Sequence, residues 1–217
     1  DNPKAAVRFS PSAVEAFRTG SQPLIYPNTD WVNYIVKPTA LQTQQNINIS
    51  GGSKFLKYVV SLGALSQDGL FNTFSTDYSY NFGYKRYNYR ANIDLDMTET
   101  TKFSLSMGGR SELRQEPGTQ PSEGIFTVLY WAVPYSGLIY EGKRILLTNR
   151  YIATAEKKDG LNAVGWGTGY ARRLSSIMNL DIAVTQKLDF VTKGLNWRFK
   201  VSNNSISLHD KTRSTSK

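Results

Sequence analysis

The sequence predicts an all-β, mainly antiparallel fold, namely a partial transmembrane β-barrel of about six strands with a short N-terminal helix and one long extracellular loop. Three observations predict it. From residue 42 onward, polar and apolar residues alternate with a period of two. Several of these segments are longer than the strands of most soluble domains and long enough to cross a bilayer. Short and long connections alternate along the chain, as they do in outer-membrane barrels.

The residues before this alternation have a different pattern. Ser10 suits the N-cap of a short helix that Gly20 ends. A turn-rich linker follows, and a second short helix is expected from Trp31 until shortly before Pro38, which cannot continue it. We therefore expect residues 1–40 to form a pre-strand segment on the extracellular side.

Six strand candidates follow this segment. They lie near residues 42–50, 55–64, 86–97, 102–110, 178–185 and 195–202. Tight turns are expected near 51–54, 98–101 and 188–194, and long connections near 67–84 and 114–173. The expected organisation is a pre-strand segment at 1–40, four strands at 41–113, a long extracellular loop at 114–172, and two strands with the start of the next loop at 173–217.

The alternation gives each predicted strand two unlike sides, because successive side chains of a strand point to opposite faces. We expect the apolar side to face lipid and the charged side to face the lumen of a barrel. The residues expected to face lipid are Leu56, Tyr58, Val60, Leu62, Tyr89, Ile93, Leu95, Leu105, Leu180, Ile182, Val184, Trp197 and Phe199. The charged residues expected to face the lumen are Arg86, Arg90, Asp94, Asp96, Arg110, Arg198 and Lys200.

The same alternation also fits a soluble protein. One antiparallel sheet of a sandwich or open meander places its polar face in water. This alternative predicts that the apolar strand faces pack on a second sheet within the chain. The connection lengths favour the barrel, because a soluble sandwich has no reason to alternate short and long connections.

Composition restricts the function classes. The 217 residues contain no Cys and one His, which excludes disulfides and Cys-ligated zinc, and a Ser–His–Asp triad is not expected. The net charge of +9 suits nucleic acid, acidic glycans or an anionic membrane without choosing among them. No apolar run is long enough for a helical span. The first residues do not form a signal peptide, so we expect any export signal to have been removed or to lie outside this chain.

The candidates for catalysis are weak. Asp94 and Asp96 share one strand face and offer paired carboxylates, but lumen charge balanced by Arg90 and Lys102 is the simpler interpretation. Neighbours on one strand cannot flank a glycosidic bond. The glycine-rich stretch at 165–169 matches no nucleotide-binding pattern. We therefore expect no enzyme, no metal site and no cofactor.

Aromatic residues concentrate in two places. Tyr78, Tyr80, Phe82 and Tyr84 recur with a period of two beside the clearest strand, which predicts a girdle at the membrane–water interface or ordinary cross-strand packing. The long loop contains further candidates for contact with a glycan or a partner protein. These are Trp131, Tyr135, Tyr140, Trp166 and Tyr170. The alternative is that they form a small core of the loop itself.

One ordered run of motifs resembles a known family. It comprises Phe9-Ser10-Pro11, Ala16-Phe17-Arg18-Thr19-Gly20-Ser21, Tyr26-Pro27-Asn28-Thr29-Asp30-Trp31, residues 46–53 with Gly51 and Gly52, and residues 58–63, 67–71 and 84–92. In order and spacing, these motifs resemble the SusC/RagA family of TonB-dependent outer-membrane transporters of Bacteroidetes, most strongly over residues 9–113. By its chemistry, the Tyr26–Trp31 motif forms turns and is expected to be structural.

The resemblance implies a function and a location. Family members import oligosaccharides or, less often, peptides across the outer membrane of Gram-negative, Bacteroidetes-like cells, together with a SusD-like lipoprotein. A plug and a TonB box precede a barrel of about 22 strands, so this chain is expected to be an early barrel fragment that is not active alone. The implied partners are the lipoprotein, outer-membrane lipid, a glycan or peptide substrate, and the TonB complex through parts absent here, with no nucleic acid. The alternative function is a soluble or surface β-sandwich carbohydrate-binding module.

Overall fold

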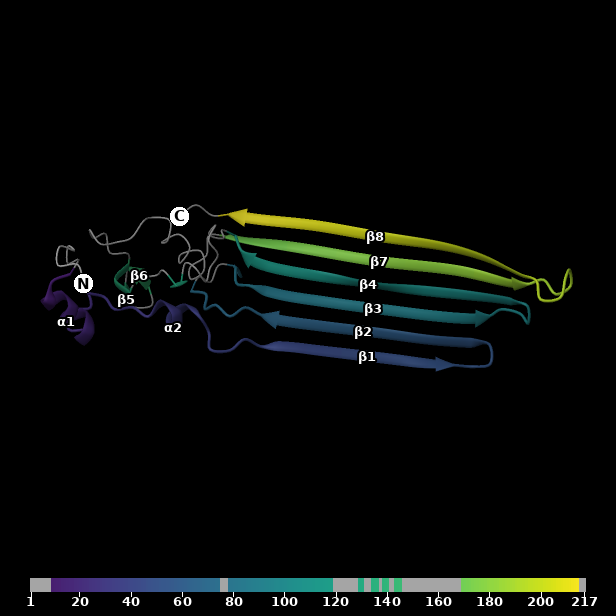
Figure 1. Ribbon diagram of the computed structural model, residues 1–217, viewed down its shortest axis with the longest axis horizontal. Helices are drawn as coiled ribbons and strands as arrows, with labels where there is room; N and C mark the ends of the chain where they lie inside the picture. The colour runs from purple at the N-terminus through teal and green to yellow at the C-terminus, as the bar shows by residue number, and fades with distance from the viewer. Residues whose placement is uncertain are drawn as a thin grey trace, which may run out of the picture.

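A computed structural model describes residues 9–74, 78–118, 129–130, 134–136, 138–140, 143–145 and 169–214. Its main body is one antiparallel sheet with the strand order β1-β2-β3-β4-β7-β8 (Figure 1). The strands are β1 (Gln42–Gly52), β2 (Leu56–Asp68), β3 (Gly83–Asp96), β4 (Thr101–Pro117), β7 (Gly169–Lys187) and β8 (Asn196–Ser214). The predicted all-β fold with six long strands is confirmed. Within the described residues, β1 and β8 each pair on one side only, so the sheet is not closed.

The six strands are long because nothing in their sequence interrupts the hydrogen-bonded ladder. β1 has 11 residues and β8 has 19. Each pair keeps one register throughout, from Gln42↔Gln67 to Gly52↔Lys57 in the first pair and from Gly169↔Ser214 to Lys187↔Asn196 in the last. Because the register does not shift along a ladder, residues two apart on one strand stay on the same face of the sheet.

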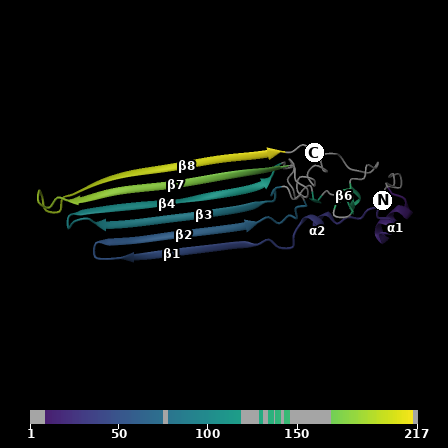
Figure 2. The same ribbon diagram turned by 180° about the vertical axis from the view of Figure 1, so that it is seen from behind.

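The connections divide between the two ends of the sheet. Short turns at 53–55, 97–100 and 188–195 lie at one end, the turn end. Connections at 69–82 and 118–168 join the strands at the other, the connection end, where α1 and α2 also lie (Figures 1 and 2). The predicted alternation of short and long connections is therefore confirmed.

Both predicted helices are present at the connection end. In α1 (Pro11–Thr19), the hydroxyl of the N-cap Ser10 accepts a hydrogen bond from the Ala13 amide at 3.2 Å, and Gly20 ends the helix with a left-handed φ of 64°. α2 (Trp31–Ile35) is capped by Asp30. In the described part of the chain, no helix is long and apolar enough to cross a membrane.

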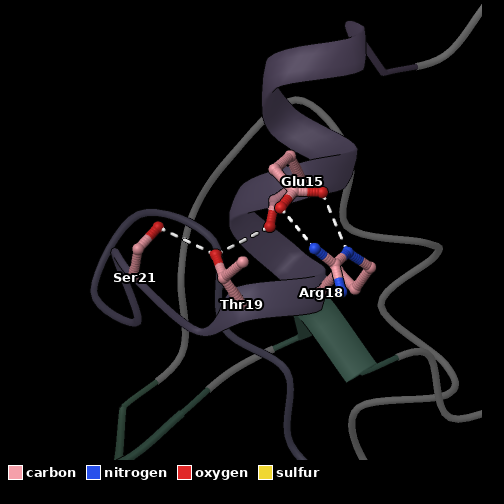
Figure 3. A network of polar contacts seen from close by, with 4 residues as sticks. All are labelled: Glu15, Arg18, Thr19 and Ser21. Atoms are coloured by element: carbon pink, nitrogen blue, oxygen red, sulfur yellow. Dashed lines mark hydrogen bonds and ion pairs between the residues drawn. The ribbon is translucent and has the colours of Figure 1, made fainter.

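The last turn of α1 is held by exposed polar contacts (Figure 3). The Arg18 guanidinium donates to both Glu15 carboxylate oxygens, at 2.9 and 2.6 Å, and lowers the pKa of that carboxyl. The Thr19 hydroxyl donates to the Glu15 carbonyl at 2.8 Å. These bonds fix a helix that buries only two alanines.

The main buried cluster lies at the connection end and not within the sheet. This connection cluster consists of Trp31, Ile35, Phe71 and Leu129. Ile35 is 0% exposed and Trp31 is 2% exposed. Because α2 supplies two of its four members, the segment before β1 is packed against the two connections that follow it.

Backbone hydrogen bonds join the same segments. The Lys37 amide donates to the Leu70 carbonyl at 2.6 Å, and the Asn72 amide donates to the Ile35 carbonyl at 2.7 Å. The Asn72 side chain donates to the Tyr34 carbonyl at 2.9 Å. The pre-strand segment is therefore bonded to the β2–β3 connection before the chain enters β1.

Three expectations differ from the structure in detail. β4 continues to Pro117 and β7 begins at Gly169, so strand pairing extends into the stretch expected to be loop. Gly51 and Gly52 lie at the end of β1 and not in the turn, because they still pair with β2. The described residues also contain two unpredicted short strands, β5 (Leu138–Tyr140) and β6 (Lys143–Ile145).

The connection cluster gives the first testable prediction. Ile35→Ala is expected to reduce local stability by about 2–5 kcal/mol, because it leaves a cavity among buried apolar side chains. Hydrogen–deuterium exchange of the peptides covering 31–37 and 69–74 should accelerate in the intact protein.

Val32 provides the matched control. It lies on the same helix but is 50% exposed, so Val32→Ala should change local stability by less than about 0.5 kcal/mol. Equal acceleration in both variants would show that the cluster does not anchor this segment.

Candidate functional site

The register of the sheet sorts the side chains onto two faces. Directly opposed residues of antiparallel strands point to the same face. One such row runs from Tyr58 through Ile93 and Leu105 to Ile182 and Val201. All the residues expected to face lipid lie on this face, here called the apolar face.

The apolar face is uncovered. Ile49 is 53% exposed, Leu62 is 50% exposed and Val201 is 50% exposed. The alternative of a soluble sandwich required a second sheet against this face. In the described residues, the other sheet contains only β5 and β6 and lies beyond the connection end (Figures 1 and 2). Within the described part of the chain, the apolar residues of these strands therefore have no partner layer.

The apolar residues form a band and do not run the full length of the strands. Tyr87 lies in a row with Gln45, Ser111 and Ser176, and the two serine hydroxyls are hydrogen-bonded at 3.1 Å. Nearer the connection end, the same face becomes polar. There, the Arg172 guanidinium donates to the Gln115 side chain at 2.7 Å. At the turn end, the stacked rings of Trp197 and Phe199 border the band, with centroids 6.1 Å apart.

Two tyrosines on the apolar face cover glycines on the neighbouring strand. Tyr89 pairs with Gly109, and Tyr58 pairs with Gly51. A Cβ atom on Gly109 would lie 2.5 Å from the Tyr89 hydroxyl, and one on Gly51 would lie 2.6 Å from the Tyr58 hydroxyl. Each ring therefore occupies the space that the glycine leaves empty, which restores packing on an otherwise weakened strand pair.

The opposite face is polar and carries paired charges. All seven charged residues expected to face the lumen lie on it, since Arg86, Arg90, Asp94 and Asp96 occupy alternate positions of β3 and the others are in register with this face. The ion pairs found on it in the described residues are Lys102–Asp94 at 3.5 Å, Arg110–Glu112 at 3.7 Å, Lys200–Asp181 at 3.2 Å, Arg173–Asp210 at 2.9 Å, and Arg114–Glu116. These five ion pairs balance part of the charge of the polar face, whereas Arg86, Arg90 and Arg198 take part in none of them.

The Asp94–Asp96 pair is not arranged as a catalytic dyad. Asp94 accepts a hydrogen bond from Ser104 at 2.6 Å and contacts Lys102 at 3.5 Å. Its carboxylate is thus engaged by strand β4 and does not act jointly with Asp96. Among the described residues, no group of three His, Cys, Asp or Glu side chains is placed to hold a metal ion.

A hollow of about 550 Å³ opens in the polar face near the middle of the strands. Its polar lining includes Asn46, Asn48, Asn88, Arg90, Arg110 and Asn179. Gly63 and Gly108 leave the space because they lie on this face without side chains. The sequence analysis missed the asparagines, since only the strand register shows that residues so far apart in the chain meet on one face.

Two of the aromatic residues expected in the long loop, Tyr135 and Tyr170, are packed against other rings. Tyr135 packs edge-on against Phe9, with centroids 5.2 Å apart. Tyr170 is 5% exposed, and its ring centroid lies 5.9 Å from that of Tyr78. The guanidinium carbon of Arg172 lies over the Tyr170 ring, 4.6 Å from its centroid. These two rings therefore fit the alternative of a small internal core, and Tyr170 is not an open platform for a sugar.

The remaining aromatic expectations have different outcomes. Trp131 and Trp166 lie outside the described residues, and only the backbone of Tyr140 is described, in β5. Tyr80 is 1% exposed, and its hydroxyl accepts a hydrogen bond from the Phe74 amide at 3.0 Å. The expected interfacial girdle is thus wrong for Tyr80, because the β2–β3 connection folds over its ring.

The Tyr26–Trp31 motif joins distant parts of the connection end. The Tyr26 ring packs against Phe17 at 5.3 Å, and the Asn28 side chain donates to the Phe17 carbonyl at 3.3 Å. The Thr29 amide donates to the carbonyl of Pro134 at 3.1 Å, in the short 3-10 helix η1 (Pro134–Ser136). The motif therefore ties α1 to the β4–β7 connection.

The rest of the motif starts α2 and is largely buried. Pro27 is fully buried, and the Asp30 side chain accepts from the Asn33 amide at 3.0 Å. Trp31 enters the connection cluster. These contacts are structural, as the turn-forming chemistry of the motif predicted.

Comparisons with known proteins agree with these features. No protein-family model matches the chain. Over 82 residues, it is 27% identical to the TonB-dependent receptor P26 of Formosa agariphila, a match that covers 38% of this chain and 7% of the receptor. Its fold is similar to part of the RagAB peptide transporter, with a TM-score of 0.57 and 19% identity over 85% of this chain and 19% of that chain. A structure of the RagAB peptide importer in the closed-closed state matches with a TM-score of 0.41 and 16% identity over 83% of this chain and 22% of that one, too weakly to establish a shared fold.

The resemblance seen in the sequence motifs is therefore confirmed, in sequence to a TonB-dependent receptor and in fold to a chain of RagAB. The match spans 7% of the curated receptor and 19% of the solved chain. These proteins are named as a receptor and a transporter, and neither name describes an enzyme.

The tyrosine–glycine pairs give the second testable prediction. Gly109→Ala is expected to destabilise the sheet by about 1–3 kcal/mol. Its Cβ would clash with the Ile177 carbonyl oxygen, which cannot move without separating β4 from β7. The midpoint of chemical unfolding, followed by circular dichroism of the intact protein, should fall.

Gly83 is the control position. A Cβ there meets nothing within 4 Å, so Gly83→Ala should leave the midpoint unchanged. An unchanged midpoint for Gly109→Ala would contradict the close packing of Tyr89 over this glycine.

Proposed function

We propose that this chain is part of the wall of an outer-membrane transporter, with its apolar face toward lipid and its polar face toward the lumen. The observation that carries the proposal is the uncovered apolar band on one face of a sheet whose other face is charged. In water, such a band would be an exposed apolar surface of a size that soluble monomers avoid. In a membrane, lipid chains cover it.

The dimensions of the band support this placement. From the row of Tyr87 to the row of Trp197, the band spans ten residue steps of β3 and its neighbours, or about 33 Å along the strands. With a strand tilt of about 40°, its height is about 25 Å, the height of the apolar band in transmembrane barrels. Aromatic rings lie at both limits, as they do at membrane interfaces.

The two ends of the sheet suggest its orientation. Outer-membrane barrels have short turns on the periplasmic side and long loops outside the cell. The connection end, with α1, α2 and the connection cluster, is then extracellular. The polar continuation of the apolar face toward this end fits strands that project beyond the hydrocarbon layer.

The transported substrate is an oligosaccharide or a peptide. The RagAB structure that shares the fold is described as a peptide transporter, which supports the peptide class. By the resemblance, uptake is driven by the TonB complex and takes place with a SusD-like lipoprotein at the extracellular face. The described residues contribute wall, lumen charge and part of that face, and no catalytic group.

A comparison of neighbouring side chains tests the wall assignment. Ile93 lies on the apolar face and Asn92 on the polar face. This chain has no cysteine, so a spin label attached to Ile93→Cys or Asn92→Cys reports one position each. In native outer membranes, the Ile93→Cys label should collide several-fold more often with oxygen, which concentrates in lipid, than with a water-soluble nickel chelate. The Asn92→Cys label should show a lower ratio, and equal or inverted ratios would refute the wall assignment.

A transport assay tests the activity. Cells that lack the gene should lose uptake of labelled oligopeptides, and a protonophore should stop uptake in the parent strain. Retained peptide uptake combined with lost oligosaccharide uptake would assign the sugar class. Unchanged uptake of both would contradict the transporter.

A further inference from the structure

In the described part of the chain, Arg90 is the arginine without an ion pair that lines the hollow of the polar face. It lies near the middle of β3, directly opposite Gly108 of β4 and Ser61 of β2. Among the described residues, it takes part in none of the ion pairs that balance part of the charge of this face. Its neighbour Arg110 already contacts Glu112 at 3.7 Å. The hollow of about 550 Å³ that Arg90 lines is called the Arg90 hollow below. It thus contains a cation that forms no ion pair with the strands around it.

The backbone conformation at Gly108, opposite Arg90, does not require a glycine. Gly108 is not among the described glycines with a positive φ, and a Cβ there would come no closer than 3.7 Å to the Tyr89 carbonyl oxygen. A Cβ on Gly63, across the hollow, would lie 2.9 Å from the movable end of the Asn46 side chain and in ordinary contact with Asn88 at 3.6 Å. Glycine weakens a strand, so its presence here is best explained by the open space it leaves beside Arg90.

The remaining polar lining suits a peptide. Asn48, Asn88 and Asn179 each present an amide that donates and accepts hydrogen bonds, as a peptide group does. The guanidinium of Arg90 matches a carboxylate in a two-pronged contact. Sugars commonly also use an aromatic ring to stack on, whereas the Tyr89 ring lies on the opposite face, over Gly109. The hollow therefore offers groups for a carboxylate and its adjacent amides.

We infer that the Arg90 hollow is a binding site for an acidic peptide, in which Arg90 pairs with a carboxylate and the surrounding asparagines hydrogen-bond the peptide groups beside it. The inference rests on the proposed function, because it needs the polar face to line the lumen. The carboxylate comes either from a transported peptide or from another segment of the same protein that lies in the lumen. The chemistry is the same in both cases, and the experiment distinguishes the two sources.

A cysteine at Ser61 reports on occupancy of the hollow. Ser61 lines it beside Arg90, and Ser61→Cys introduces one thiol into a chain that has none. The labelling rate by an uncharged, water-soluble maleimide is measured in the intact protein in outer membranes. The probes are a hexapeptide of glutamates and, as control, a hexapeptide of glutamines. The background variants are Arg90→Gln and the matched control Arg114→Gln, an arginine of the same face outside the hollow.

If the source is a transported peptide, the glutamate peptide should slow labelling by about fivefold, and the glutamine peptide should not. If the source is a segment of the protein, labelling should already be slow without any peptide. In both cases Arg90→Gln should remove the protection, whereas Arg114→Gln should keep it. Labelling that stays fast when the glutamate peptide is present, or that is slow but unaffected by Arg90→Gln, overturns the inference.

A second cysteine variant distinguishes failure of the binding-site inference from failure of the proposed function. Val60 is adjacent to Ser61 and lies on the apolar face. If Val60→Cys stays unlabelled by the water-soluble reagent while Arg90→Gln has no effect at Ser61→Cys, the binding site is wrong and the wall assignment stands. If the reagent labels Val60→Cys faster than Ser61→Cys in the Arg90→Gln background, the face assignment is wrong and both proposals fail.

Discussion

The structure depends on one constraint: a single sheet with unlike faces must have its apolar face covered, and the described part of the chain does not cover it. The ladder from β1 to β8 continues without a change of register, so the alternation of the sequence becomes a continuous separation of faces. Tight packing is found instead at the connection end, around Trp31 and Ile35. In the proposed transporter wall, lipid covers the apolar face and neighbouring strands pair with both open edges.

The charges on the polar face are partly arranged in ion pairs. Its charges are arranged in opposed pairs such as Lys200–Asp181 at 3.2 Å, which limits the field of the face as a whole. A net charge of +9 therefore does not create a uniformly cationic surface. The total charge therefore says little about what this face binds, and local features such as the open space beside Arg90 say more. Individual exposed ion pairs also contribute little to stability.

The strands, their turns and the two helices could be predicted from the sequence, because a period of two and caps such as Ser10 and Gly20 are local signals. The division of charged and apolar residues between the two faces was predictable for the same reason. The Arg90 hollow was not, since it depends on Gly63, Gly108 and Asn179 meeting across four strands. The burial of Tyr80 and Tyr170 was also not predictable, because it depends on how the connections fold over the sheet.

The most direct test of the account is the sidedness of the two ends in living cells. Thr73 lies exposed in the β2–β3 connection and Glu99 lies exposed in the β3–β4 turn. Thr73→Cys and Glu99→Cys are treated with a membrane-impermeant biotin maleimide before and after lysis. A sheet that spans the outer membrane predicts that Thr73→Cys is labelled on intact cells and Glu99→Cys only after the outer membrane is opened. Labelling of both on intact cells, or of Glu99→Cys alone, would contradict a sheet that spans the outer membrane with its long connections outside.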